Sequence, residues 1–155
     1  MTTAQAFLST VIRPTLLQIG LDSTAAEELL LGTALQESEL IHRRQIGGGP
    51  GLGYYQMEPA THDDIWNNFL KYRKDLAAKI EALVAPYKDK LKALELNDRY
   101  ATAMARVLYL RAPAPLPPAG DIEAMAKYWK QYYNTPLGAG KPEQFVAKWK
   151  KYVGS

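Results

Sequence analysis

Glu37 is the side chain of this sequence whose type and position best suit acid–base chemistry. On a helix that turns about 100° per residue, Ala26, Leu30, Thr33 and Ala34 project within about 60° of Glu37. The carboxyl group therefore continues the apolar face of its helix at the last turn. A carboxylate in apolar surroundings either finds a partner or has its pKa raised, and then it keeps a proton near neutral pH. Such a glutamate can act as general acid toward a glycosidic oxygen.

A structural role for Glu37 stays open from position alone. The side chain can turn to solvent at the end of its helix, or it can pair with Arg43 or Arg44, because structural ion pairs also perturb carboxylates. Glu39 lies about 200° further round the helix and is the poorer candidate for catalysis. The segment that follows the helix favours the catalytic interpretation.

A glycine-rich break follows Glu37. Five glycines and Pro50 fall between Gly47 and Gly53, which predicts a long loop. Loops of this length inside a domain are usually functional or disordered.

The segment GYYQMEPAT, residues 53–61, supplies polar and aromatic side chains next to this loop. Gln56 offers a donor and an acceptor for the N-acetyl or hydroxyl groups of a sugar, and Tyr54 and Tyr55 can stack on sugar faces. One of the two adjacent tyrosines is expected to pack inward, and Met57 is expected in the core.

The sequence QES at residues 36–38, together with GYYQMEPAT, resembles the catalytic core of phage-type lytic transglycosylases and goose-type lysozymes. In that family a helix ends in glutamate and serine, a variable loop follows, and a pattern like G-L-M-Q-I-x-P-x-T comes next. The pattern is met here by Gly53, Gln56, Met57, Pro59 and Thr61. The resemblance implies a lysozyme-like fold with Glu37 as the catalytic residue. It also implies substrate-binding positions at Ser38, Tyr54, Tyr55 and Gln56.

The segment YYNTPLGAG, residues 132–140, resembles the A-Y-N-x-G segment of the same family, whose tyrosine lies close to the catalytic acid. The glycine expected shortly after the asparagine is displaced to Gly138. The resemblance implies that Tyr133 and Asn134 are further substrate-binding residues, and Tyr133 could hydrogen-bond Glu37. Tyr133 also continues the apolar face of its helix, which allows a packing role.

Many glycosidases use a second carboxylate. Asp63 and Asp64, expected on the first turn of a helix that begins near Pro59, are available for that role or favour the helix N-terminus electrostatically. The family resemblance instead implies that Glu37 acts alone, first as acid and then as base, while the N-acetyl or 6-hydroxyl group of the substrate replaces the second residue. Transglycosylases then release an anhydro sugar, whereas lysozymes admit water, and the sequence leaves both reactions open.

The hydrophobic periodicity predicts a mainly α, lysozyme-like fold in one domain, residues 1–155, with about six or seven helices and at most a small β-hairpin near residues 40–57. Pro14 is expected to kink or split the first helix. Thr24 and Glu27 are expected to form a capping box at the start of the helix that ends near Ser38. Further helices are expected from about residues 59, 71, 98, 121 and 142, with the small apolar side chains of residues 101–108 in a central helix.

Composition excludes several classes of site. The 155 residues contain no cysteine, and His42 and His62 are too far apart in sequence to suggest a zinc site, so no metal or other cofactor is expected. The segment GGGPGLG lacks the Lys-Ser or Lys-Thr of a phosphate loop. Tyrosines and tryptophans among the lysines of residues 127–152 fall at helical spacing, which favours packing, and nucleic acid is not expected as a partner.

Net charge is +3, and no stretch approaches the roughly 20 apolar residues of a membrane span. The first 20 residues lack the pattern of a secretory signal. We expect a protein made in the cytoplasm that acts on the cell wall or periplasm as a phage lysin or virion-associated part, with virion or lysis-system proteins as further partners.

The sequence therefore predicts an enzyme that binds peptidoglycan glycan strands and cleaves the β-1,4 bond between N-acetylmuramic acid and N-acetylglucosamine as a lytic transglycosylase. The alternatives are a hydrolytic muramidase of the endolysin type and a non-catalytic sugar-binding or virion structural module on the same fold.

Overall fold

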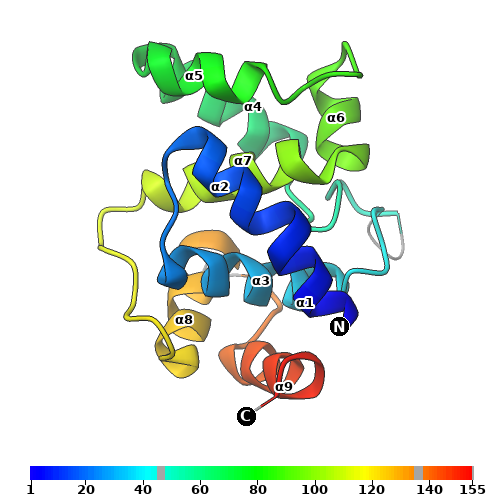
Figure 1. The fold of residues 1–155 in the computed structure, drawn as a ribbon, viewed down its shortest axis with the longest axis vertical. Helices are drawn as coiled ribbons and strands as arrows, with labels where there is room; N and C mark the ends of the chain where they lie inside the picture. Colours follow the sequence, from blue (N-terminus) through cyan, green and yellow to red (C-terminus); the bar gives the residue numbers. More distant parts are fainter. Residues whose placement is uncertain (45–47, 135–137, 155) are drawn as a thin grey trace.

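The computed structural model describes residues 1–44, 48–134 and 138–154, and helices account for most of this length (Figure 1). The mainly α prediction is confirmed. Two expected features extend outside the described residues, namely Gly47 in the glycine-rich loop and residues 135–137 of YYNTPLGAG. The helices are α1 (Thr3–Phe7), η1 (Leu8–Ile12), α2 (Arg13–Ile19), α3 (Thr24–Ser38), α4 (Pro59–Asn68), η2 (Leu70–Tyr72), α5 (Lys74–Glu81), α6 (Lys90–Leu96), α7 (Asp98–Leu110), α8 (Ile122–Trp129), η3 (Lys130–Asn134) and α9 (Pro142–Tyr152).

The central helix is α7, as the small apolar side chains of its sequence predict. Ten consecutive residues, Tyr100–Tyr109, are buried. Helix α7 contacts α2 and α3 on one side and α4, α5 and α6 on another. In Figure 1, α4, α5 and α6 lie above α7, while α3, α8 and α9 lie below it. One hydrophobic core runs through these layers.

The N-terminal rod, α1–η1–α2, stays continuous through Pro14 but contains a π-turn. Pro14 has no N–H and cannot bond the carbonyl of Thr10, four residues earlier. The Arg13 N–H bonds Leu8 O, the longer π spacing, just before the proline. Arg99 of α7 donates to the Thr10 carbonyl at 3.2 Å. The helix therefore continues past Pro14, because a π-turn replaces the normal hydrogen-bond spacing and Arg99 of a neighbouring helix bonds the free carbonyl.

Several helix starts agree with the sequence, because capping depends on neighbouring residues. Asn97 accepts from the Tyr100 N–H, and Asp121 accepts from the Ala124 N–H. The start of α3 differs by one residue, since Ser23 and not Thr24 is the cap. Glu27 lies in the first turn and ion-pairs with Arg13 at 2.8 Å, so the capping box expected there is replaced by a tertiary contact.

The expected hairpin near residues 40–57 is reduced to two isolated bridges within the described residues, Arg44 with Leu52 and Leu52 with Met57. Leu52 and Met57 exchange both backbone hydrogen bonds across a tight turn, at 3.0 and 3.2 Å. Met57 is buried, as predicted. Within the described residues, each helix is too short or too polar to cross a lipid bilayer.

The contact between α3 and α9 depends on Gly32. A Cβ atom at this position would lie 2.2 Å from Cζ of Phe145, so the ring of Phe145 occupies the space that any other residue would fill. Phe145 is buried and packs against Trp129 of α8, with ring centroids 5.8 Å apart. A glycine inside α3 thus brings three helices into close contact.

We expect Gly32→Ala to destabilise the protein by about 1–3 kcal/mol, because the added methyl overpacks the core. The better helix propensity of alanine, worth about 1 kcal/mol, would by itself act in the opposite direction. Urea unfolding of Gly32→Ala, of Phe145→Leu and of the double variant Gly32→Ala/Phe145→Leu measures the coupling between the two positions in the free energy of unfolding. The double variant should lose less stability than the sum of the single losses, and additive losses would contradict the contact.

Candidate active site

Glu37 is the penultimate residue of α3, and its side chain is only partly exposed. Its Oε2 atom accepts a hydrogen bond from Nε1 of Trp129 at 3.0 Å. Burial raises the pKa of Glu37 from 4.5 to about 7, against the smaller opposing effects of the Trp129 hydrogen bond and the positive charge of Lys148. The carboxyl group can therefore both donate and accept a proton near neutral pH.

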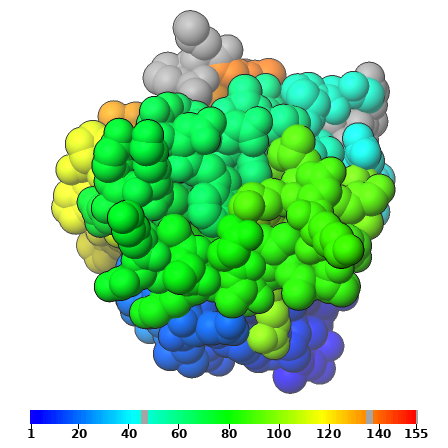
Figure 2. All heavy atoms as spheres, turned by 90° about the horizontal axis from the view of Figure 1, so that it is seen from above, coloured from blue at the N-terminus to red at the C-terminus, as the bar shows by residue number. Residues whose placement is uncertain are grey.

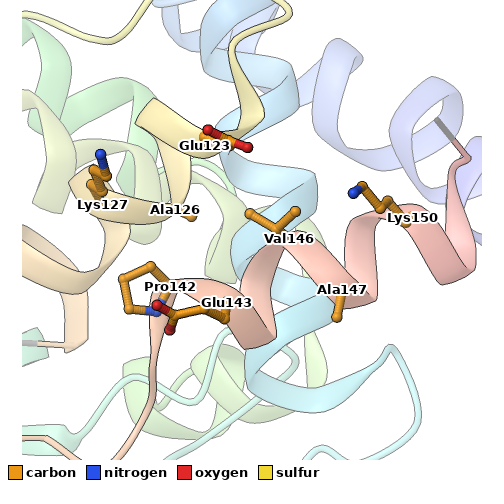
Figure 3. Close-up of a pocket in the computed structure, with 8 residues that line it drawn as sticks. All are labelled: Glu123, Ala126, Lys127, Pro142, Glu143, Val146, Ala147 and Lys150. Atoms are coloured by element: carbon orange, nitrogen blue, oxygen red, sulfur yellow. The ribbon is translucent and has the colours of Figure 1, made fainter.

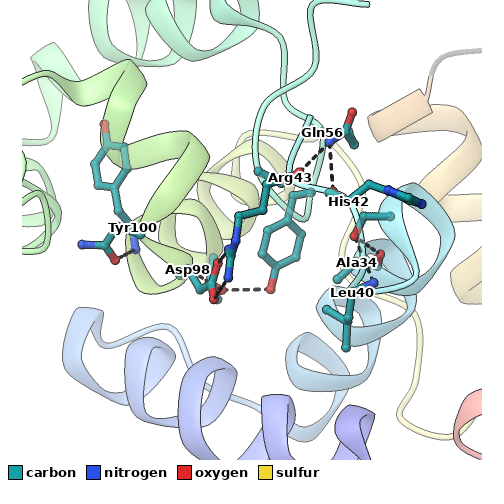
Figure 4. Close-up of polar contacts among 12 residues, drawn as sticks. Ala34, Leu40, His42, Arg43, Gln56, Asp98 and Tyr100 are labelled. Carbon is teal, nitrogen blue, oxygen red and sulfur yellow. Dashed lines mark hydrogen bonds and ion pairs between the residues drawn. The ribbon is translucent and has the colours of Figure 1, made fainter. Parts of the chain in front are cut away.

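Arg43 and Arg44, the alternative partners of Glu37, each bind another carboxylate. Arg43 binds both carboxylate oxygens of Asp98 (Figure 4). Arg44 binds both oxygens of Glu95, at 2.7 and 3.1 Å. Within the described part of the chain Glu37 forms no ion pair, so the alternative in which it pairs with Arg43 or Arg44 is not realised.

Glu39, two residues on, has the opposite environment. It lies in the left-handed region, with φ of 53°, just after α3 ends. Its carboxylate accepts from the Tyr152 hydroxyl at 2.5 Å and lies 3.6 Å from the Lys151 ammonium. The Tyr152 hydrogen bond and the lysine charges lower its pKa. Glu39 is therefore an ionised surface residue, in agreement with its ranking below Glu37.

Trp129 holds Glu37 in place, and the sequence did not single it out for this role. Its ring is fully buried between Phe145 and Gly140, where a Cβ atom would lie 2.5 Å from the indole ring. The indole N–H has therefore one fixed direction, toward Glu37. Its only sequence signal was its place one helical turn before Tyr133, on the same side of the helix.

Lys148 of α9 provides the nearby positive charge. Its Nζ atom donates to the Gln36 carbonyl at 2.9 Å, which anchors the ammonium group at the end of α3. From there its charge lowers the pKa of both Glu37 and Glu39. The helix α9 thus contributes Phe145 for packing and Lys148 for electrostatics at this site.

Tyr133 lies close to Glu37 but is bonded elsewhere. Its hydroxyl donates to the Tyr55 carbonyl at 2.6 Å, so the expected hydrogen bond to Glu37 is not formed. Burial, together with the negative charge of Glu37, raises its pKa well above the ordinary value. Its ring packs on Tyr109 at 5.4 Å, and the Tyr109 hydroxyl lies 2.7 Å from the hydroxyl of Thr33, one turn before Glu37.

The two adjacent tyrosines point to different surroundings. Tyr55 is 1% exposed, and its hydroxyl lies 2.9 Å from that of Thr102. The expectation that one of the pair packs inward is confirmed, and the expectation that the Tyr55 ring stacks on a sugar is wrong. Tyr54 is half-buried, with the Arg43 guanidinium 4.0 Å above its ring and Phe7 at its edge.

Gln56 closes the turn in which it lies. It adopts a left-handed φ of 51°, uncommon for a residue other than glycine, and its Nε2 donates to Gly53 O at 2.7 Å (Figure 4). Its Oε1 atom is buried and finds no hydrogen-bond partner among the described residues. The amide is thus oriented by its own loop, while one acceptor is left over for a further donor.

Ser38 and Asn134 shape the backbone next to the site. The Ser38 hydroxyl donates to Ala34 O and accepts from the Leu40 N–H, so it caps the turn that ends α3. Asn134 accepts from Lys130, which also binds Gly138 O at 2.7 Å. Substrate contact by either residue stays a prediction.

Asp63 and Asp64 lie in the second turn of α4, not the first as expected. Asp64 binds Arg111 at 2.8 Å and Asn68 at 2.6 Å, and Asp63 lies 3.0 Å from His62. Within the described residues, no other carboxylate perturbs the pKa of Glu37. No group of three or more acidic or histidine side chains among these residues is arranged to hold a metal ion.

Two hollows lie beside η3, α8 and α9, the helices that carry Tyr133, Trp129 and Lys148. One, of about 280 Å³, borders Tyr133 and is also lined by Thr61, Leu108, Arg111, Ala112 and Tyr132. The other, of about 400 Å³, lies between α8 and α9 (Figure 3), and its lining residues are Glu123, Ala126, Lys127, Pro142, Glu143, Val146, Ala147 and Lys150.

Comparisons with protein-family models, curated proteins and solved structures give no match to this chain. The functional argument therefore rests on the geometry around Glu37, on the segment QES that contains it, and on the segment GYYQMEPAT that follows it.

The raised pKa of Glu37 predicts a pH-dependent stability. Because the folded-state pKa of about 7 exceeds the ordinary value of 4.5, the native state is stabilised fully below pH 4.5 and loses this stability as pH rises through 7. We expect Glu37→Gln, which keeps an acceptor for Trp129, to raise the free energy of unfolding by about 1–3 kcal/mol at pH 8 and to leave it nearly unchanged at pH 4.

The matched control is Glu39→Gln. Since the pKa of Glu39 is lowered, this variant should lose stability at pH 8 and not at pH 3. Urea unfolding followed by circular dichroism measures both. A Glu37→Gln variant with the same gain at pH 4 and pH 8 would contradict the raised pKa.

The hydrogen bond from Trp129 predicts a second effect. Trp129→Phe keeps an aromatic ring in the core but removes the indole N–H, which stabilises the charged carboxylate. We expect the pKa of Glu37 to rise from about 7 to about 8. Carbon NMR titration of the glutamate carboxyl groups measures this shift, and Trp149→Phe is the control. An unchanged pKa in Trp129→Phe would show that the bond does not act on Glu37.

Proposed function

We propose that this protein cleaves the β-1,4 glycosidic bond of peptidoglycan between N-acetylmuramic acid and N-acetylglucosamine, as a lytic transglycosylase with Glu37 as its single acid and base. The observation that carries the proposal is the carboxyl group of Glu37, whose pKa burial raises to about 7 and which receives one oriented hydrogen bond from Trp129. The resemblance of the QES and GYYQMEPAT segments to that family supplies the substrate class.

The reaction begins with protonated Glu37. Its proton passes to the glycosidic oxygen, the bond from that oxygen to the anomeric carbon of N-acetylmuramic acid breaks, and positive charge develops on the sugar. The resulting carboxylate is stabilised by the Trp129 N–H and by the charge of Lys148. Both groups favour the charged form, so they lower the barrier to proton donation.

The second step returns the proton to Glu37. The ionised carboxylate accepts the proton of the 6-hydroxyl of the same sugar while that oxygen bonds the anomeric carbon, which gives a 1,6-anhydro product. Atoms balance without water. This step needs one basic group on the enzyme.

The surroundings of Glu37 favour this ring closure over hydrolysis by two carboxylates. Hydrolases of that kind hold the second carboxylate within roughly 5–9.5 Å of the first. Within the described residues, Asp63 and Asp64 are bound to His62, Asn68 and Arg111. Glu39 is likewise bonded to Tyr152 and lies beside Lys151. The 6-hydroxyl of the substrate therefore takes the place of the second group.

The proposal is tested on purified peptidoglycan sacculi. We expect Glu37→Gln to release soluble fragments at least about 100-fold more slowly than wild type, because the amide cannot donate the proton. Glu39→Gln is the matched control and should keep wild-type activity, since Glu39 is bonded to Tyr152 and Lys151. Equal release by wild type and Glu37→Gln would end the catalytic role of Glu37 and favour a non-catalytic module.

Mass spectrometry of the same fragments separates the two reactions. A transglycosylase leaves an anhydro terminus that is lighter by one water than the terminus left by a hydrolase. We expect the anhydro form to dominate. Products with reducing termini alone would replace the transglycosylase by a hydrolytic muramidase that uses the same glutamate.

A further inference from the structure

The segments coloured green, α4 to α6, cover the face of the molecule seen in Figure 2. A hollow of about 710 Å³ lies between the segment that enters α5 and the end of α7. Its floor includes the apolar side chains of Leu21, Leu76 and Leu110. Its rim carries Lys71, Tyr72, Arg73, Lys74 and Asp75. Its lining residues lie outside α3 and α8, which hold Glu37 and Trp129 and lie below α7 in Figure 1. The hollow is therefore separate from the candidate active site.

The rim carries three cations and one acid. Lys71, Arg73 and Lys74 are exposed, and within the described residues none of them forms an ion pair. Arg73 lies 4.7 Å from the centre of the Phe69 ring, and the Lys71 ammonium lies 5.7 Å from that of Tyr72. These ring contacts orient the cations without neutralising them.

This arrangement contrasts with that of three other arginines. Arg43, Arg44 and Arg111 each bind a carboxylate. Three like charges around one hollow repel each other, and an anion bound between them removes that repulsion. Arginine and lysine together are the residues that bind phosphate groups.

One aromatic ring stands beside the cations. Tyr72 is 72% exposed, and among the described residues it is the only aromatic side chain of the large exposed hydrophobic ones. A single ring suits one sugar or polyol unit next to a phosphate. Single-stranded nucleic acid is usually held by several aromatic rings on which successive bases stack, and this face offers only one.

We infer that this hollow binds the phosphate groups of an anionic cell-wall polymer, a chain of sugar or polyol units joined by phosphodiesters. Lys71, Arg73 and Lys74 bind the phosphate oxygens, and Tyr72 packs on the adjoining sugar or polyol unit. The choice of a wall polymer rests on the proposed function, because such a polymer stands beside the glycan strands that Glu37 would cleave. Binding here holds the enzyme at its substrate.

The test measures binding of purified poly(glycerol phosphate) by isothermal titration calorimetry. The hollow variant is Lys71→Gln/Arg73→Gln/Lys74→Gln. The control is Lys88→Gln/Lys92→Gln/Lys150→Gln, which also removes three positive charges, but from exposed positions outside the hollow. Circular dichroism verifies that both variants are folded. All measurements use the Glu37→Gln background, so the result does not depend on catalysis.

We expect the hollow variant to bind at least about 10-fold more weakly than its parent at 50 mM salt and the control variant to bind within about 2-fold of it. With three phosphate contacts, log affinity of the parent against log salt should have a slope of about −2, and the hollow variant a slope near zero. Equal loss of affinity in the two variants would overturn the proposal in favour of net charge alone.

Two further ligands test the identity of the partner. Single-stranded DNA of equal phosphate number and vesicles with anionic phospholipid should bind more weakly than poly(glycerol phosphate). Tighter binding of either by the parent would overturn the assignment to a wall polymer.

If Glu37→Gln still releases fragments from sacculi, the proposed cleavage fails while this binding result stands. If the hollow variant binds as its parent does, only the hollow proposal fails.

Discussion

The hydrogen bond from Trp129 to Glu37 is the interaction on which the site depends. It joins α3 to α8 across 92 residues of sequence, and it is fixed because the indole ring is fully buried against Phe145. Phe145 in turn fits only because Gly32 has no side chain. A mid-helix glycine, which lowers helix propensity, is thus compensated by the packing that it permits. The acid is oriented by the same contacts that stabilise the three helices.

The electrostatics around Glu37 follow from how other charges are paired. Arg43 and Arg44 follow it closely in sequence, yet Asp98 and Glu95 bind them. Lys148 remains nearby at the Gln36 carbonyl, and its effect on the pKa of Glu37 is smaller than that of burial. Desolvation raises the pKa of Glu37 more than the Trp129 hydrogen bond and the Lys148 charge lower it, so the pKa lies near neutrality. Glu39, bonded to Tyr152, shows the opposite balance two residues away.

The helices were predictable from the sequence to the extent that local contacts decide them. Asn97 and Asp121 cap the helices that follow them, and Pro142 begins α9, because a cap or a proline acts within one turn. Glu27 was assigned to a capping box and binds Arg13 instead, a contact 14 residues away. The tyrosines of the motif show the same limit: Tyr55 packs inward and Tyr133 bonds its carbonyl across 78 residues, and spacing along the chain indicates neither.

The sequence by itself determined that the chain is mainly α, that Glu37 ends an apolar helix face, and that a glycine-rich loop and Gln56 follow. These features depend on helical periodicity and on residues a few positions apart. Only the tertiary structure decided that Glu37 is bonded by Trp129 and lacks an arginine partner, and that Lys71, Arg73 and Lys74 surround one hollow. The physical reason is that desolvation and charge pairing are set by side chains from distant helices, whose approach depends on the packing of the whole core.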